Sequence, residues 1–490
     1  MSQQDFGISG LSVFVPPYRV QLQDWCQWTG GDWAKISAVV GHSFRLRGPE
    51  DSVYTMAAQA ALRLIIDNKV DPTRVGYLAL ATESSSDNAI GAVIVRGLLD
   101  QALEAHGLPP LSRNCEVPEL KQACIAGLYG VKGAIRYLAH DGAGRCAIVV
   151  SADAAEYELG STGEPTQGAG AVATLVEQNP KLLALDLAQS GSASNYRIAD
   201  FRKPFVRYAE QEPGTHGRLT DFPVFNGKYS TACYLDEVIC AFDAMFTRRK
   251  GARAQYLREL AAAFMHRPYR HMPVSAWTMA YLFALGADGG KEHEELAGYC
   301  AAVQQPLEKV LEEMRSRPRI ASDIEKGIAP DEPYPLTALV MKAFRKSAAY
   351  KAVVEDKLQL GADLMMNLGN LYTAALPAWL AAGFEDALDK SVELTGRQIL
   401  LVGYGSGDAA DAIPARVMPG WEKAAVRIGL KASLGGAVDL SQDGYRTLHG
   451  GDAASETSSL VRKGFLVRHA GHTQTPRFTD TGIEYYEYRR

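Results

Sequence analysis

Short continuous runs of apolar residues alternate with longer segments of helical spacing in the first part of the chain. The continuous runs have the length of buried strands, and the longer segments repeat apolar residues every three or four positions, as amphipathic helices do. The predicted strands are 76–83, 146–154, 170–177 and 182–190, and the predicted helices are 52–68 and the run that follows Cys124. Continuous apolar strands between helices are typical of a sheet buried on both faces. The pattern therefore predicts an α/β protein.

The same alternation returns toward the C-terminus, after a middle section of different character. Helical spacing is found at 341–358 and 371–388, a strand running into a Gly/Ser turn is predicted from Gln398, and further strands are predicted at 426–432 and 464–471. From about 248 to 357 the composition is helical and charged, as in helices with solvated faces. An alanine-rich helical run is predicted to end at His266. Two αβ-rich halves indicate a duplicated architecture, which divides the chain into 1–195, 196–360 and 361–490.

Composition narrows the classes of function. The chain has 490 residues and a formal net charge of −5 without a basic run, so nucleic acid is not an expected partner. Its seven cysteines are scattered and form no CxxC pair, which argues against a disulfide framework and a zinc ribbon. No secretory signal pattern and no membrane-length apolar run is present. We expect a soluble, cytoplasmic protein that holds no metal and no redox cofactor.

Cys124 opens a helix whose spacing predicts burial, in the stretch ELKQACIAGLYG. A thiol is a small hydrophobe, so one interpretation is packing in the core. The other is that unpaired N–H groups and the macrodipole at the helix N-terminus favour a nucleophilic thiolate. Position alone does not decide between these two interpretations.

Three further residues sit at predicted element ends. Glu83 ends a buried strand, where a carboxylate can serve as a general base or cap the next helix. His266 precedes a proline-containing turn, and it either faces a cleft or interacts with a helix dipole. Asn370 precedes a small-residue helix, and it either donates to a carbonyl oxygen or caps that helix. The Gly-rich turn after Gly403 lacks the GxxxxGK[ST] pattern of a nucleotide P-loop.

Taken together, these motifs resemble the hydroxymethylglutaryl-CoA synthase family of the thiolase superfamily. The similarity runs in order from about residue 6 to the C-terminal Tyr/Arg cluster, through GISGLSVFVPPYRV, ATESSSD, ELKQACIAG, EPTQGAGAVATLV, DFRKPF, NGKYSTACYLD, FMHRPYRHM, GNLYTAAL and GYGSG. The resemblance implies a thiolase-like duplicated αβαβα layered fold with an inserted helical region. It places the catalytic glutamate and cysteine in the N-terminal half and the catalytic histidine in the middle segment.

The resemblance also implies roles for individual residues. Cys124 would take acetyl from acetyl-CoA, Glu83 would enolise that acetyl group, and His266 would assist its addition to the ketone of an acetoacetyl thioester. Substrate-binding positions would be Thr166, Ser230, His271, Asn370 and Ser406. Coenzyme A thioesters would be substrates, no cofactor would be needed, and the family's homodimer would be expected.

Some positions depart from the family pattern. Lysines usually follow the histidine, whereas this chain has His271 and Ser275; the serine before Tyr-Gly-Ser-Gly is Gly403, and the asparagine before the Pro-Thr strand is replaced near Thr162. The segment between His266 and Asn370 is also long. These departures leave two acceptors open: free acetoacetyl-CoA, as in the mevalonate pathway of isoprenoid biosynthesis, or an acyl-carrier-protein thioester, as in polyketide β-branching. A third hypothesis is a non-catalytic scaffold subunit of the same fold.

Overall fold

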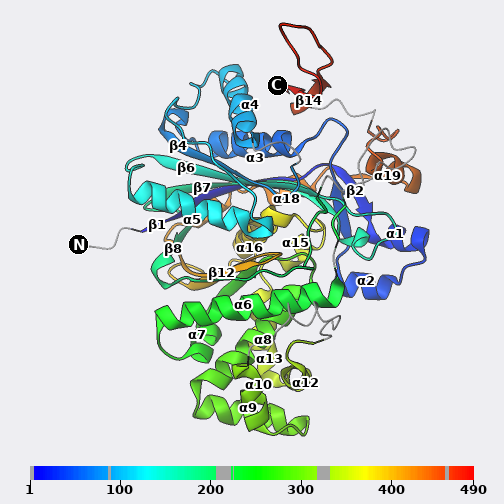
Figure 1. Ribbon diagram of the computed structural model, residues 1–490. Helices are drawn as coiled ribbons and strands as arrows, with labels where there is room; N and C mark the ends of the chain where they lie inside the picture. The colour runs from blue at the N-terminus through cyan, green and yellow to red at the C-terminus, as the bar shows by residue number, and fades with distance from the viewer. Residues whose placement is uncertain (1–4, 86–89, 206–221, 225, 317–331, 458–462) are drawn as a thin grey trace.

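Five layers of helices and strands make up the body of the molecule (Figure 1). The computed structural model describes all residues except 1–4, 86–89, 206–221, 225, 317–331 and 458–462. Helices α3 (Val53–Asp67) and α4 (Gly91–Ala105) form one outer layer, and α5 (Ala126–Ala139) and α16 (Ala375–Asp389) lie between the upper and lower strands. Helix α6 (Gly227–Arg249) covers the lower strands. The sequence prediction of an α/β protein is therefore correct.

The strands belong to one continuous sheet that bends around the central helices. Its order is β10-β11-β12-β8-β1-β7-β6-β4-β5, with β9 paired to β12. The bounds are β1 Phe6–Phe14, β4 Val75–Ala81, β5 Glu119–Leu120, β6 Cys146–Ala155, β7 Gly168–Gln178, β8 Leu183–Leu185, β9 Gly191–Ser194, β10 Ala262–Met265, β11 Gln398–Gly405 and β12 Ala409–Val417. Strands β4, β5 and β6 are parallel, as are β10 and β11. The two halves of the chain thus share one sheet through β1, β8 and β12.

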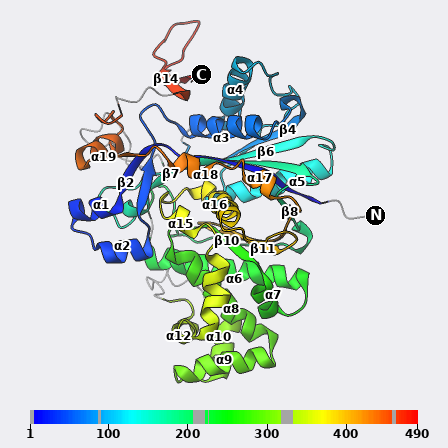
Figure 2. The ribbon, with the colours of Figure 1, turned by 180° about the vertical axis from the view of Figure 1, so that it is seen from behind.

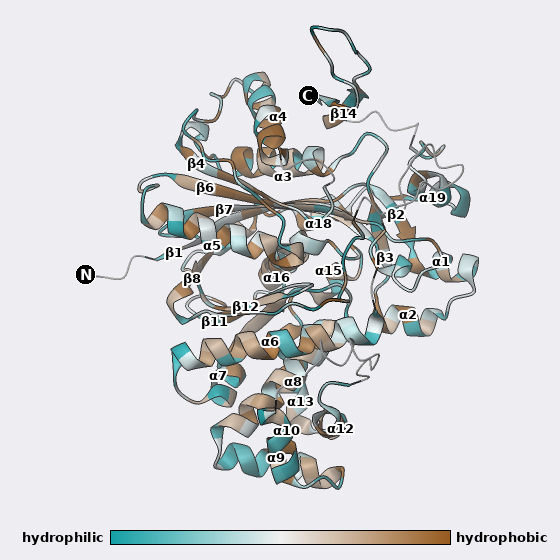
Figure 3. Ribbon diagram, viewed as in Figure 1, coloured by the Kyte–Doolittle hydropathy of each residue, from teal (hydrophilic) through white to brown (hydrophobic). Residues whose placement is uncertain are grey.

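Hydrophobic burial explains the order of the layers. Every residue of β4 is buried, and so are the first eight residues of β6. Hydrophobic residues gather on the strands and the enclosed helices, whereas α9 (Lys291–Ala302) is largely hydrophilic (Figure 3). Helix α3 begins with a capping box in which Ser52 and Thr55 exchange hydrogen bonds, a feature that stabilises the first turn of a helix.

The charged middle section forms a helical region on the far side of α6 (Figure 1). It contains α7 Arg253–Glu259, α8 His271–Asp288, α9, α10 Leu307–Arg315 and α12 Pro335–Phe344. The prediction of a single helix over 341–358 is wrong. This segment is divided into the end of α12, α13 (Ala348–Tyr350), a π-helical turn (Lys351–Glu355) and α14 (Asp356–Leu358).

Three other predictions are corrected by the structure. The alanine-rich run before His266 is strand β10 and not the end of a helix, because it pairs with β11 and is buried throughout. Residues 426–432, predicted as a strand, contain the start of α18 (Leu430–Leu434), which follows α17 (Glu422–Ala425); both helices pack on β1 (Figure 2). The strand predicted at 182–190 is short, because a 3-10 turn begins at Leu187.

Smaller elements complete the fold. Strands β2 (Tyr18–Gln21), β3 (Ser43–Leu46) and β13 (Val438–Asp439) form a small sheet beside α1 (Leu22–Thr29), α2 (Trp33–Val39) and α19 (Gln442–His449). Strands β14 (Gly464–Ala470) and β15 (Glu484–Arg489) pair as a hairpin that packs on α3 and α4. Among the described residues, no helix combines the length and the apolar character that crossing a bilayer requires.

Candidate active site

Cys124 and Glu83 are brought together by two neighbouring parallel strands. Strand β4 ends two residues before Glu83, and β5, paired with the end of β4, leads into the 3-10 turn Ala123–Ile125 that holds Cys124. Both side chains therefore emerge at the same edge of the sheet, where ligands bind in open α/β sheets. The Cys124 Sγ donates a hydrogen bond to Glu83 Oε2 at 3.0 Å. Ala123, just before the cysteine, has a φ of 44°, a left-handed backbone conformation that few non-glycine residues adopt.

Burial keeps this pair protonated. It raises the pKa of Glu83 to about 8, against the lowering effect of the Cys124 hydrogen bond. Burial and the neighbouring Glu83 charge raise the pKa of Cys124 well above its usual value. The expectation that the helix N-terminus stabilises a free thiolate is therefore wrong for the unliganded protein, because desolvation and a nearby carboxylate outweigh the dipole.

Asp153, at the end of β6, anchors the backbone on both sides of this pair. Its Oδ1 accepts from Thr82 Oγ1 at 3.0 Å, from the Glu83 and Ser84 N–H groups at 2.8 and 2.9 Å, and from Ser84 Oγ at 2.7 Å. Its Oδ2 accepts from the Thr373 N–H at 3.0 Å and from Thr373 Oγ1 at 2.5 Å. The carboxylate thus fixes the Glu83 turn against the segment that leads into α16. The sequence analysis missed Asp153, which stands inside a strand-like apolar run.

His266 approaches the cavity from the other half of the sheet, directly after β10. Its N–H donates to the Val402 carbonyl at 2.8 Å, and its carbonyl accepts from the Tyr234 hydroxyl at 2.8 Å. The imidazole stacks on the Tyr404 ring with 6.4 Å between ring centroids. Burial lowers the pKa of His266 to about 3, so the ring is neutral at physiological pH. A neutral imidazole can donate a hydrogen bond but carries no positive charge.

One cavity of about 140 Å³ joins these groups. The predicted site residues that line it are Cys124, Thr166, Ser230, His266, Asn370 and Ser406. Glu83 reaches this cavity through its bond to Cys124. Asn370 Oδ1 accepts from the Tyr372 N–H at 2.9 Å, and the Asn370 N–H donates to the Thr166 carbonyl at 2.9 Å. The capping interpretation of Asn370 is wrong for α16, whose N-cap is Ala374; the Asn370 side chain instead bonds the first residue of the 3-10 turn Tyr372–Ala374 beside the cavity.

His271 lies apart from the other predicted residues. It is the exposed first residue of α8 and is not among the residues that line the cavity. Its Nε2 lies 3.1 Å from Ser275 Oγ, which also accepts from Arg345 at 3.3 Å. Burial, Arg345 and Arg270 lower the pKa of His271. The predicted substrate-binding residue His271 is therefore not brought together with the other predicted site residues.

Aromatic side chains that the sequence analysis did not single out enclose Cys124. Tyr157, Phe201 and Tyr372 lie with ring centroids 5.7 to 6.5 Å apart and form one buried cluster with the cysteine. Tyr372 follows Asn370 in the quoted stretch GNLYTAAL, and Phe201 lies in DFRKPF. Phe201 and Tyr372 could therefore have been identified as site residues from these motifs. Tyr157 stands in a loop outside any quoted motif.

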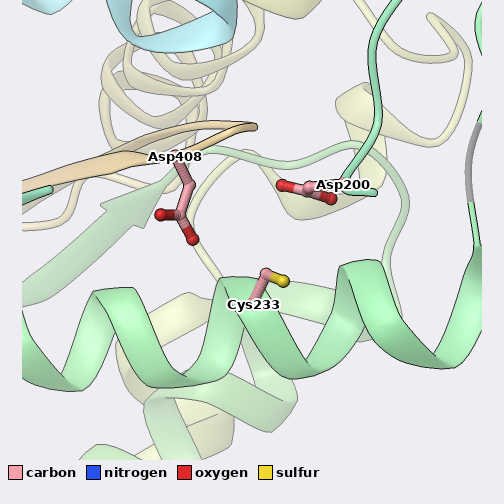
Figure 4. A group of neighbouring side chains, drawn as sticks. All are labelled: Asp200, Cys233 and Asp408. Atoms are coloured by element: carbon pink, nitrogen blue, oxygen red, sulfur yellow. The ribbon is translucent and has the colours of Figure 1, made fainter. Parts of the chain in front are cut away.

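A buried acidic cluster lies beneath the cavity wall. Possible ligand atoms of Asp200, Cys233 and Asp408 lie within 4.8 Å of one another (Figure 4). The positive charge facing Asp408 is already supplied by Arg197, whose Nε lies 3.4 Å from Asp408 Oδ2. Asp200 accepts from the Tyr404 hydroxyl at 2.7 Å and from the Gly407 N–H at 3.0 Å. The arrangement fits an ionic network better than a metal centre.

Comparison with known proteins agrees with this geometry. A sequence model of the hydroxymethylglutaryl-coenzyme A synthase N-terminal region matches residues 2–181. The hydroxymethylglutaryl-CoA synthase of Haloferax volcanii is 27% identical over 90% of this chain and 91% of its own length. That of Enterococcus faecalis is 29% identical over 54% of this chain and 62% of its own.

Solved structures extend the similarity to the whole chain. MvaS in complex with 3-hydroxy-3-methylglutaryl coenzyme A is 26% identical with a TM-score of 0.76, and the match covers 100% of both chains. PksG, an HMG-CoA synthase from Bacillus subtilis, is 18% identical with a TM-score of 0.70 over 99% of this chain and 100% of its own, which shows the shared fold. The thiolase-like layered architecture expected from the sequence is confirmed. With the ordered motifs converging on one cavity, the chain belongs to the hydroxymethylglutaryl-CoA synthase family of acyl-condensing enzymes.

Proposed function

We propose that this protein condenses acetyl-CoA with an acetoacetyl thioester to give a hydroxymethylglutaryl thioester. One observation carries the proposal: the Cys124 thiol donates to the Glu83 carboxylate at 3.0 Å, and Cys124 and His266 line the same cavity. A nucleophile hydrogen-bonded to its own base, in a cavity with a neutral donor, fits covalent acyl transfer followed by carbon–carbon bond formation.

The first half of the reaction uses the Cys124–Glu83 pair. In its ionised form, Glu83 takes the thiol proton as the sulfur attacks the carbonyl carbon of acetyl-CoA, and it then passes that proton to the leaving coenzyme A thiolate. This gives an acetyl thioester on Cys124 and a Glu83 carboxylate beside it. Because burial raises the pKa of Glu83 to about 8, the carboxylate is a stronger base than an exposed one.

The second half joins the two substrates. Glu83 removes a proton from the acetyl methyl group, and the resulting enolate carbon attacks the ketone carbon of the acetoacetyl thioester. The neutral His266 ring donates a hydrogen bond to the ketone oxygen, and the proton that Glu83 removed from the methyl group is returned to the resulting alkoxide to give the tertiary alcohol. Water then cleaves the thioester to Cys124 and restores the thiol.

The carrier of the acceptor distinguishes two versions of this function. The relatives named hydroxymethylglutaryl-CoA synthase favour acetoacetyl-CoA and a place in the mevalonate pathway. The positions where the family's lysines are expected hold His271 and Ser275, which leaves the carrier of the acceptor open. The second candidate acceptor is an acyl-carrier-protein thioester; structures of the curacin HMG synthase, which is 20% identical, include a complex with acetyl donor-ACP, in which a carrier protein bears the donor.

We also propose a homodimer. The first turn of α4 exposes two large apolar side chains, Ile90 at 54% and Val93 at 56%. The neighbouring strand β5 ends the large sheet. Exposed apolar residues beside an open sheet edge are typical of a protein–protein contact.

The test is the intact mass of the purified protein after acetyl-CoA, followed by acetoacetyl-CoA or an acetoacetyl carrier protein. We expect an acetyl adduct that is absent from Cys124→Ala and is discharged by one of the two acceptors. The variant should lose at least about 10⁴-fold of the overall rate. A folded wild-type protein that forms no adduct would overturn the proposal and support a non-catalytic scaffold.

A further inference from the structure

Arg197 is a buried cation that links three segments of the chain. It is 2% exposed. Its Nη2 donates to Asp236 Oδ2 at 2.5 Å and to Glu237 Oε2 at 3.2 Å, both on α6. Its Nε lies 3.4 Å from Asp408 Oδ2, in the turn between β11 and β12. A planar guanidinium with several donors suits such simultaneous contacts.

The backbone around Arg197 is joined to the same turn. The Arg197 N–H donates to the Gly407 carbonyl at 2.9 Å, and Asn195 and Asp408 exchange N–H···O bonds of 3.1 and 2.7 Å. The turn that contains Ser406, part of the cavity wall, is therefore fixed from two directions: by these backbone bonds and by the ion pair to Asp408.

A second connection runs from the Arg197 segment to His266. The Asp200 N–H donates to the Arg197 carbonyl at 3.3 Å, which places the Asp200 carboxylate under the Tyr404 hydroxyl. Tyr404 in turn stacks on the His266 imidazole. Movement of the Arg197 segment would shift the partner against which the His266 ring packs.

The charges of the network explain why one guanidinium controls the geometry. The carboxylates of Asp236, Glu237 and Asp408 surround it and are 4%, 2% and 4% exposed. Burial raises the pKa of Asp408 and Glu237 and the Arg197 charge lowers both, so without the guanidinium these buried carboxyl groups would be protonated. The electrostatic attraction that holds Asp408 near Arg197 and α6 would then be lost, and the turn that carries Ser406 would change its position.

The helical region is tied to the same network. Tyr334, which is fully buried, donates its hydroxyl to Asp236 Oδ1 at 2.7 Å. It directly precedes α12, so the long segment between His266 and Asn370 contributes one hydrogen bond to the support of the cavity wall.

We propose that Arg197 is a positioning residue for the acceptor side of the cavity, acting through Asp408 on the Ser406 turn and through Asp200 and Tyr404 on His266. This inference rests on the proposed condensation. Cys124 and Glu83 are held separately, by the β4–β5 edge and by Asp153. Arg197 therefore serves the second half of the reaction and not the first.

The test compares the two half-reactions in Arg197→Met and Arg197→Lys. We expect Arg197→Met to load acetyl on Cys124 at the wild-type rate, while kcat/KM for the acceptor falls by about 10- to 100-fold, the cost of misplacing a reacting group by a fraction of an ångström to an ångström. Arg197→Lys should recover part of the loss, because it restores the charge without the full set of contacts. Asp408→Asn should give an acceptor defect that does not add to that of Arg197→Met.

Lys132→Met is the matched control. Lys132 forms another buried ion pair, with Asp411, and does not contact the Ser406 turn. It should lower the melting temperature without changing the KM of the acceptor. Wild-type acceptor kinetics in a folded Arg197→Met would overturn the inference, and so would equal losses of acetyl loading and condensation. Absence of the acetyl adduct in the wild type would contradict the proposed function instead.

Discussion

The two walls of the cavity are built in different ways. The wall with Cys124 and Glu83 depends on neighbouring parallel strands and on Asp153 of the N-terminal half, and Asp153 joins it to Thr373 of the C-terminal half. The opposite wall, with His266 and Ser406, is assembled from β10, the β11–β12 turn, α6 and the Arg197 segment. The first wall holds the groups that a donor acyl group needs, and the second wall holds the groups that face a ketone acceptor. The comparison suggests that donor and acceptor functions can be damaged separately.

The largest expected loss of activity comes from a substitution in the first wall, which holds Cys124 and Glu83. Glu83→Ala should reduce condensation by about 10³-fold, because it removes the carboxyl that is hydrogen-bonded to Cys124 and is the proposed base for the acetyl methyl group. Acetyl loading should fall less, since a thiol can lose its proton to water or buffer more easily than a C–H bond can. Mass spectrometry of the acetyl adduct, together with steady-state rates, separates the two steps. If Glu83→Ala condensed normally, the assignment of the base would be wrong.

A smaller effect is expected from the second wall. His266→Ala removes the donor to the ketone oxygen and the ring that stacks on Tyr404. Condensation should fall by about 10²-fold, with a raised KM for the acetoacetyl thioester and unchanged acetyl loading. His266→Asn keeps a donor and should recover part of the rate. Loss of acetyl loading in a folded His266→Ala would mean that the two walls do not act separately.

The two walls also differ in how far the sequence predicted them. The strand before Glu83 and the helix after Cys124 were predicted correctly, because continuous apolar runs and helical spacing are local signals. The strand before His266 was predicted as a helix, since an alanine-rich run has helical propensity and only its pairing with β11 makes it a strand.

Long-range polar contacts were the main omission. Asp153, Arg197 and Asp408 act through partners far away in the chain, so no local pattern marks them. The protonation state of Cys124 also could not be predicted from the sequence. The motif located the thiol, but desolvation by the folded protein and the approach of Glu83 decide that it stays protonated.

The smallest expected effect is on stability, and it tests the protonation state of Glu83 in the first wall. Burial raises the pKa of Glu83 to about 8, whereas an unfolded glutamate titrates near its ordinary value of about 4.3. Between these pH values the folded protein holds a proton that the unfolded chain has released, so this group's contribution to stability falls as pH rises. The slope is about 1 kcal/mol per pH unit, reduced from the full linkage value because Glu83 is partly exposed to the cavity.

Glu83→Gln tests this linkage, because its amide does not titrate. The melting temperature of the variant relative to the wild type should rise steadily from about pH 5 to about pH 8 and level off above that range. Cys124→Ala is the control, since it removes the hydrogen bond that lowers the pKa of Glu83 but leaves the carboxyl in place. It should keep the fall in stability with rising pH and extend it to higher pH, because the pKa of Glu83 rises further without this hydrogen bond. A difference between Glu83→Gln and the wild type that does not change with pH would mean that the Glu83 carboxyl is ionised in the folded protein, and the thiol of Cys124 would then face a fixed negative charge throughout this range.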